Sequence, residues 1–260
     1  MNALTFLEWT SGRFILVLLR LTTLLSLAPF YGLTNVPVRL RIGLAVLVAL
    51  IVTPVVAVPD LATYDLAGFI LLGMKEAIIG ALLAFSLLLI FAAAQFGGHI
   101  IGYQMGLAMA NTVDPQGQIS ISVIGEIYYV VAMLLFLAFD GHHFIMRAVV
   151  HSFDLIPIDS LVLDGGGMRL LIRLSANVFL LAIQLAAPVI AALLTTSVAL
   201  GLIARTVPQM NVFIVGFPIK VGLGLLIAVL SLPFFAAAFQ VAWQTAERDA
   251  LTLLMAFSGV

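Results

Sequence analysis

The run AIIGALLAFSLLLIFAAAQFGGHIIGYQMGLAMANTV, residues 77–113, contains no charged side chain. A helix needs about 20 apolar residues to cross the hydrocarbon core of a bilayer, so this run is longer than one crossing requires. The rest of the chain has the same character, because 63% of its 260 residues are hydrophobic and only 9% are charged. An average soluble domain carries roughly 25% charged residues. The composition therefore predicts an all-α integral membrane protein.

The gaps between charges indicate how the chain is organised. The charge-free runs are Leu21–Val38, Ile42–Pro59, Ala77–Val113, Ile127–Phe139, Leu174–Ala204 and Val221–Ala246. They predict about six long apolar helices, near 14–33, 42–57, 66–94, 121–139, 169–204 and 212–243. The Gly-rich stretch at 97–120 and the segment 140–168, with Pro157 and three consecutive glycines, are predicted to be connections. The uneven lengths favour helices that are buried against protein rather than surrounded by lipid.

The orientation in the membrane stays open. Arg39, Arg41 and Arg205 favour cytoplasmic loops, but helices held inside an assembly need not cross a bilayer. No basic residue precedes Arg13, and Arg20 interrupts the first apolar region, so we expect an uncleaved first helix rather than a signal peptide.

Several functional classes fit the sequence poorly. Eleven Lys and Arg against twelve Asp and Glu give a net charge of −1, which supplies no cationic field for nucleic acid. The chain has no cysteine for thiolate chemistry, and the spacings of zincins, P-loops and nucleophile elbows are missing. His142 and His143 beside Asp140 are interpreted as a loop-capping or interfacial feature rather than a metal site. We therefore expect no enzyme activity, no cofactor and no metal.

Small residues recur every four positions toward the end of the central run, at Ala94, Gly98, Gly102, Gly106 and Ala110. On a helix they form one bare stripe that another backbone can approach closely. The partner could be another helix of this chain or a second subunit. Met105 and Met109 form an adjacent flexible stripe, which is either ordinary core or a seal that can open.

The stripe runs into NTVDPQGQIS, residues 111–120, where Pro115 must interrupt a helix and Asp114 is driven toward extended backbone. Such irregular backbone cannot face lipid, because its unpaired polar groups would be costly in hydrocarbon. The segment therefore either lines a cavity, is buried in protein, or is a surface loop.

Five charged residues interrupt apolar helices. They are Arg20, Lys75, Glu76, Glu126 and Lys220. Charges of this kind either form structural ion pairs or face an aqueous path. Lys75 and Glu76 lie about 100° apart on a helix, so they do not pair with each other and each needs its own partner.

Four stretches resemble the FliR family of flagellar biosynthesis proteins, in the same order. They are GYQMGLAMANTVDP at 102–115, LLFLAFDGHHF at 134–144, LAAPVIAALLTTSVAL at 185–200 and ALGLIARTVPQMNVFIVGFPIKVGLG at 199–224. The related injectisome component is the second choice, although GFPIK at 216–220 looks more like the flagellar branch.

The resemblance implies a non-enzymatic subunit of the flagellar type III protein export gate in the bacterial inner membrane, at the flagellar basal body. It implies a helical assembly with FliP-like and FliQ-like subunits, further FlhB-like and FlhA-like components, and unfolded exported proteins as substrate. Residues 1–168 would be the FliP-like four-helix part and residues 169–260 a FliQ-like hairpin.

The resemblance also assigns roles to individual residues. The loop 106–122 would plug the closed channel, and the plug and gate residues would be Met105, Gly106, Met109, Asp114, Pro115, Gln116 and Gly117. The bend of the C-terminal hairpin would contain Pro208, Asn211, Phe213, Gly216 and Pro218. The alternative function is a secondary transporter of a small solute that uses Lys75, Glu76 or Glu126 as ion ligands.

Overall fold

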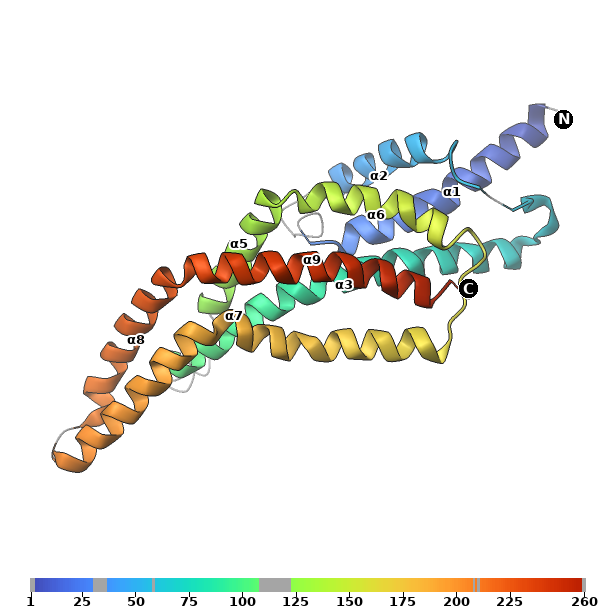
Figure 1. Ribbon diagram of the computed structural model, residues 1–260. Helices are drawn as coiled ribbons and strands as arrows, with labels where there is room; N and C mark the ends of the chain where they lie inside the picture. Colours follow the sequence, from blue (N-terminus) through green and yellow to red (C-terminus); the bar gives the residue numbers. More distant parts are fainter. Residues whose placement is uncertain are drawn as a thin grey trace. The chain divides into compact units, whose positions relative to one another are not determined.

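The computed structural model describes residues 3–29, 37–57, 59–107, 123–207, 209 and 211–258. Every regular element within these ranges is a helix (Figure 1). They are α1 (Ala3–Leu27), α2 (Val38–Val52), the 3₁₀-helix η1 (Leu61–Thr63), α3 (Leu66–Met105), α5 (Val123–Ala138), α6 (Gly141–Leu155), α7 (Gly165–Thr206), α8 (Val212–Leu230) and α9 (Leu232–Ala256). The predicted all-α membrane fold is confirmed for the described part of the chain.

Two helices, α3 and α7, are long and apolar enough to cross a membrane. Two bent pairs also qualify if each pair is taken as one span: α5 with α6, bent by 69°, and α8 with α9, bent by 58°. The described residues thus offer two candidate crossings, or up to four. The expected count of six long elements is not confirmed.

The chain folds as two compact units. Unit 1 consists of Met1–Leu89, Asp140–Ser175 and Gln244–Val260, and unit 2 of Ile90–Phe139 and Ala176–Trp243. The helices α3, α7 and α9 contribute residues to both. This division by contacts does not test the predicted boundary at 168/169, which rests on likeness to other subunits and stays a prediction.

Unit 1 is built on close contacts of α1. The buried face of α2 is narrow, with Ala45 and Ala49, and α2 lies alongside α1 (Figure 1). On α3, Gly73 also faces α1: a Cβ added to it would lie 2.9 Å from the Leu19 side chain. After α6, the chain returns to the end of α9, where the Val162 N–H donates to the Phe257 carbonyl oxygen at 3.0 Å. Small residues therefore let the helices of this unit approach closely.

The core of unit 2 is aromatic. Phe91 of α3 makes edge contacts with Phe136 of α5, at 5.6 Å between ring centroids, and with Phe239 of α9, at 6.1 Å. Phe136 in turn meets Trp243 at 5.0 Å. Such edge-to-face pairs place the positive edge of one ring on the negative face of another. The four rings therefore join α3, α5 and α9 within this unit.

Several expected helix boundaries are wrong. α1 begins at Ala3 rather than near residue 14 and ends at Leu27. α2 begins at Val38, directly after Pro37 at its N-cap. The glycines after residue 94 do not end α3, which continues to Met105. Glycine is tolerated there because close contacts with neighbouring helices offset its weak helix propensity.

The segment 140–168 is not only a connection, because it contains α6. Asp140, with a left-handed backbone at φ 56°, turns the chain between α5 and α6. The buried side chains of α6 include Phe144, Ile145, Ala148 and Val149, which follow the helical period. The three glycines at its far end belong to the first turn of α7, where the Asp164 carboxylate accepts the Gly167 N–H at 2.8 Å.

The last expected helix, 212–243, is two helices that separate at Ser231. Pro233 lacks the N–H that a continuous helix would donate at this point, so the chain breaks just before it. The Phe235 N–H then donates to the Ser231 carbonyl at 2.9 Å, which starts α9. α9 continues to Ala256, well past the expected end.

Candidate functional site

A buried ion pair lies at the centre of unit 1. Arg20 of α1 donates from Nε to Glu76 Oε2 of α3 at 2.6 Å, and both side chains are fully buried. The other guanidinium nitrogens donate to Ser152 Oγ at 3.0 Å and to the Ile156 carbonyl oxygen at 2.9 Å. The guanidinium also stacks over the Phe153 ring, 4.0 Å from its centroid. One arginine thus connects α1, α3 and the end of α6.

A glycine makes this pairing possible. Gly80 follows Glu76 by one turn, and a Cβ added to it would collide with the Arg20 carbonyl oxygen. The backbones of α1 and α3 therefore touch beside the pair, which brings the two side chains within reach. Glu76 Oε1 accepts no hydrogen bond from the described residues. Because a buried charge without its partner is costly, Arg20 and Glu76 depend on each other.

A second cluster in unit 1 is centred on Asp159, in the loop after α6. Lys75 Nζ donates to Asp159 Oδ1 at 2.7 Å and to the Asp159 carbonyl oxygen at 3.1 Å, and the Tyr64 hydroxyl donates to Oδ2 at 2.6 Å. These hydrogen bonds, from Lys75 first and then Tyr64, lower the pKa of the Asp159 carboxyl, while the bond to Asp159 raises the pKa of Tyr64. Asp159 has φ 80°, a strained conformation that the contacts on both sides of its carboxylate hold in place.

The structure brings only some of the five predicted charges together. Lys75 and Glu76 have separate partners, as their angular separation on the helix predicts. Glu126 of α5 is exposed and accepts a hydrogen bond from Gln95 at 3.2 Å. Lys220 of α8 is half-buried and has no hydrogen bond or ion pair within the described ranges. Lys75 and Glu76 have separate partners within unit 1, and Glu126 has its partner within unit 2. These contacts give the transporter alternative no support.

The glycine stripe of α3 is used, at least in part, inside this chain. Ala94 is buried, and a Cβ on Gly98 would lie 2.7 Å from the Gly125 Cα of α5. The neighbouring Gly97 is not part of the stripe and faces α7. A Cβ added to it would lie 2.8 Å from the Ala182 carbonyl oxygen. Gly102 is also buried. Ala110 lies outside the described residues.

The end of α3 is the root of the predicted plug. Met105 is fully buried, and Gly106, with φ 88°, ends the helix. The other predicted plug residues, Met109, Asp114, Pro115, Gln116 and Gly117, lie outside the described residues. The structure therefore leaves their role a prediction.

The predicted hairpin bend precedes and begins α8. Asn211 stands before the first residue of α8, and its Oδ1 accepts the Ile214 N–H at 3.3 Å. Gly216 is buried and faces Leu200 of α7, while Pro218 lies inside the helix. Pro208 lies outside the described residues, and Phe213 is described by its backbone alone.

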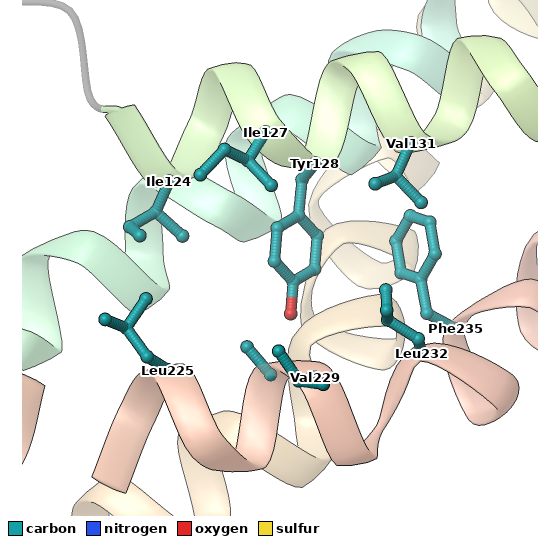
Figure 2. A pocket seen from close by; sticks show the side chains of 9 residues that line it. Ile124, Ile127, Tyr128, Val131, Leu225, Val229, Leu232 and Phe235 are labelled. Carbon is teal, nitrogen blue, oxygen red and sulfur yellow. The ribbon is translucent and has the colours of Figure 1, made fainter. Parts of the chain in front are cut away.

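Unit 2 also contains an apolar pocket of about 180 Å³ (Figure 2). Figure 2 shows Tyr128 extending from α5 toward α8, with Leu225 and Val229 on the opposite wall. Every other lining residue is apolar, namely Ile124, Ile127, Val131, Leu225, Ala228, Val229, Leu232 and Phe235. Such a wall suits an apolar group, and the Tyr128 hydroxyl is its one polar side-chain group.

Asp140, His142 and His143 place one ligand atom each within 4.8 Å of one another. His143 Nδ1 lies 3.4 Å from Asp140 Oδ1, and the ring centroids of His142 and His143 are 4.1 Å apart, with the two rings tilted by 39°. The cluster stands at the first turn of α6, where the positive end of the helix dipole opposes a bound cation. Asp140 stands at the N-cap position of α6 but its side chain makes no capping hydrogen bond, so the predicted loop-capping or interfacial role stays a prediction.

The sequence interpretation missed Ser152, Asp159 and Gly80, which complete the two charge clusters. Asp159 and Ser152 lie in the segment taken for a connection. A signal was available, because α6 has an apolar stripe of helical period and Ser152 lies on it. Nothing in the sequence around Gly80 distinguishes it from the other glycines in apolar helices.

The chain is similar to known proteins over most of its length. The family model described as bacterial export proteins, family 1, matches residues 12–246. The flagellar biosynthetic protein FliR of Pectobacterium carotovorum subsp. carotovorum is 35% identical over 232 residues, 89% of this chain and 88% of that protein. FliR of Bacillus subtilis (strain 168) is 35% identical, covering 84% and 85%, and FliR of Escherichia coli (strain K12) is 34% identical, covering 84% of each.

Proposed function

This chain belongs to the family of bacterial export proteins, family 1, and we propose that it is a non-enzymatic membrane subunit of the flagellar type III protein export gate. The observation that carries the proposal is the match to FliR proteins at about 35% identity over at least 84% of both chains. The apolar helices, two of which can cross a membrane, support it because such a gate must be embedded in one.

We further propose that the subunit works in the bacterial inner membrane, at the flagellar basal body, within an assembly of FliP-like and FliQ-like subunits and beside FlhB-like and FlhA-like components. Exposed apolar side chains such as Leu50, at 62%, and Val198, at 65%, support a chain that other apolar surface must cover. Residues 1–168 would correspond to a FliP-like part and residues 169–260 to a FliQ-like hairpin.

The proposed task of residues 106–122 is to plug the channel while no protein is exported. The segment follows directly from the buried end of α3, so a plug at this place would have a firm base in Met105. When the gate opens, unfolded flagellar proteins would pass through the channel. The energy for export would come from other components.

A deletion of the gene tests the proposal as a whole. We expect non-motile cells that lack hook and filament proteins outside the cell, restored by the wild-type gene. Affinity purification of the chain should also recover FliP-like and FliQ-like proteins. Normal secretion of hook protein by the deletion strain would contradict the proposed function.

The plug role has a separate test. Deleting residues 106–122 should make membranes that contain the whole assembly leaky to ions or small dyes. Unchanged permeability, with the assembly still recovered, would show that the segment seals nothing.

A further inference from the structure

Three side chains at the start of α6 bring metal-ligating atoms together. Asp140, His142 and His143 each offer one such atom, and all three residues belong to unit 1. The part of the chain that the structure describes contains no second group of this kind. Zinc binds imidazole nitrogen and carboxylate oxygen, and two histidines with one carboxylate are a known ligand set for it. The residue types at this place therefore suit a zinc ion.

The separations between the ligand atoms also suit one ion. Zinc binds nitrogen and oxygen at about 2.0–2.1 Å, so two ligand atoms of a tetrahedral site lie about 3.3 Å apart. His143 Nδ1 and Asp140 Oδ1 are 3.4 Å apart, which is close to that separation and long for a hydrogen bond. Both side chains are exposed, so small rotations bring them and His142 into range of a shared ion.

The first turn of α6 holds the ligands on a fixed backbone. The N–H groups of His143 and Phe144 donate to the Asp140 carbonyl oxygen at 2.9 and 3.3 Å. Phe144 and Ile145 are buried and anchor this turn in the core of the unit. An ion that binds here does not have to order the backbone first, and such preorganisation raises affinity.

The polar atoms of the cluster are not used as a purely capping role would use them. Asp140 stands at the N-cap position, but its carboxylate makes no capping hydrogen bond. His142 Nδ1 is shielded from solvent and has no hydrogen bond within the described ranges. A shielded polar atom without a partner calls for an explanation, such as an ion. A cap explains neither group, whereas a bound metal can use both side chains.

The helix dipole opposes a cation at this place, but only weakly. A charge at an exposed helix end changes an equilibrium by about two- to fivefold. Loss of a hydrogen-bond partner of a metal ligand already lowers metal affinity by about 10- to 100-fold. Each of three direct ligands therefore contributes more than the dipole removes, and the negative charge of Asp140 is itself favoured at this end of the helix.

We propose that Asp140, His142 and His143 bind one zinc ion, with water completing its coordination. The ion connects Asp140 to the two histidines of the first turn and so holds the left-handed backbone of Asp140, at φ 56°, where α6 begins. All three ligands come from this chain, so the site does not depend on the proposed role in export.

The test measures zinc binding by the full chain with the proteins that co-purify with it. The sample is isolated in detergent through a tag without histidine, freed of metal with a chelator, and titrated with Zn²⁺ alone against a coloured competing chelator. The variants are His143→Ala and Asp140→Asn. Asparagine keeps the N-cap and tolerates the left-handed backbone but lacks the charged ligand, so this variant separates a zinc ligand from a cap.

The same helix offers a matched control. His151 Nδ1 lies 3.5 Å from Asp154 Oδ2, again with three residues between the pair's positions. Within the described ranges no third ligand joins this pair. His151→Ala removes an exposed histidine from α6 without touching the proposed site, so it should leave zinc binding unchanged.

We expect wild type and His151→Ala to bind one zinc ion per chain at this site, and His143→Ala and Asp140→Asn to bind it about tenfold more weakly or not at all. Zinc should raise the melting temperature of the first two proteins but not of the last two. X-ray absorption at the zinc edge of the wild-type protein should show imidazole scattering with ligands at about 2.0–2.1 Å. This measurement requires no variant to fold.

Equal zinc affinity for wild type, His143→Ala and Asp140→Asn would overturn the proposal, as would a wild-type protein that binds no zinc. An equal loss in His151→Ala would show unspecific binding by surface histidines and would also count against the site. Normal secretion by the gene deletion strain would contradict the export function and leave the zinc site standing.

Discussion

Arg20 shows how a single residue can hold several helices of a membrane protein. Its guanidinium has a carboxylate, a hydroxyl, a carbonyl and an aromatic face around it, all from other parts of unit 1. The planar fork of arginine suits such a set, because its five donors point in fixed directions. Lysine could not satisfy the same partners.

Removal of one charge from this pair should be costly. Glu76→Gln keeps the shape but leaves Arg20 as a buried cation without its counter-ion, so we expect a loss of about 3–5 kcal/mol. The same change at the exposed Glu126 should have little effect and serves as the control. The measurement is thermal stability of the purified complex in detergent. Equal stability of the two variants would refute the structural role of the pair.

The Asp159 cluster predicts a dependence on pH. The pKa of Asp159 is lowered in the folded chain by the hydrogen bonds from Lys75 and Tyr64. Its contribution to stability is therefore fully present above the unfolded value of about 3.9 and is lost as pH falls through the lower folded pKa. Because the pair is partly exposed, the contribution should be about 1 kcal/mol or less.

Asp159→Asn isolates this effect, since asparagine tolerates positive φ about as well as aspartate. We expect the variant to melt at a lower temperature at neutral pH and to show a smaller further loss below about pH 4. Parallel melting curves of the two proteins across this pH range would contradict the assignment.

At the scale of the element, α3 makes different contacts on different faces. Gly80 meets α1 in unit 1, while Gly97 meets α7 and Gly98 meets α5 in unit 2. Each contact is between backbones, so a methyl group there has no flexible neighbour that can move aside. These small residues of α3 thus serve packing within this chain. Whether a small residue packs inside the chain or on another subunit has to be determined for each contact separately.

Gly98→Ala should destabilise the α3–α5 contact. The added methyl group would meet the Gly125 backbone at 2.7 Å, and overpacking of this kind costs about 1–3 kcal/mol. Gly201→Ala on α7 is the control, because nothing lies within 4 Å of its added methyl group. Alanine forms helices better than glycine, so the control should be neutral or slightly stabilised. Recovery and melting temperature of the complex should separate the two variants.

At the scale of the whole molecule, α3 and α7 contribute residues to both compact units and are also the two helices that can cross a membrane. α3 has 40 residues and is about 60 Å long at about 1.5 Å per residue, about twice the hydrocarbon thickness. A helix of this length extends beyond the hydrocarbon core unless it is strongly tilted. Much of the apolar surface of α3 is therefore covered by other parts of the protein rather than by lipid.

The crossing by α3 can be tested directly, because the chain contains no cysteine. Single cysteines at Leu66 and Tyr103, which are 78% and 74% exposed, lie near the two ends of the helix. We expect a membrane-impermeant maleimide to label the two cysteines from opposite sides, one of them in right-side-out vesicles and the other in inverted vesicles. Labelling of both from one side would show that α3 does not cross.

The sequence alone determined the class of protein, the presence of long apolar helices and the family. Scarce charges and long hydrophobic runs can be read directly from the sequence. In a membrane such runs must be helical, because a helix satisfies its own backbone hydrogen bonds. Helix ends were less predictable. Pro233 and the stripe of α6 were visible signals, but Pro233 lies inside a charge-free run, and α6, which contains Arg147 and Asp154, lies outside all of them. A division by charge-free runs therefore missed both.

Only the tertiary structure decided which charges pair, which glycines are indispensable and what holds the end of α3. Arg20 and Glu76 are 56 residues apart, and Lys75 and Asp159 are 84 apart. Gly222 and Gly224 look alike in the sequence, yet one faces open space and the other faces Met105. The physical reason is that hydrophobicity is a property of each residue by itself. Ion pairs and close contacts instead depend on which helix faces, distant in the sequence, pack against one another.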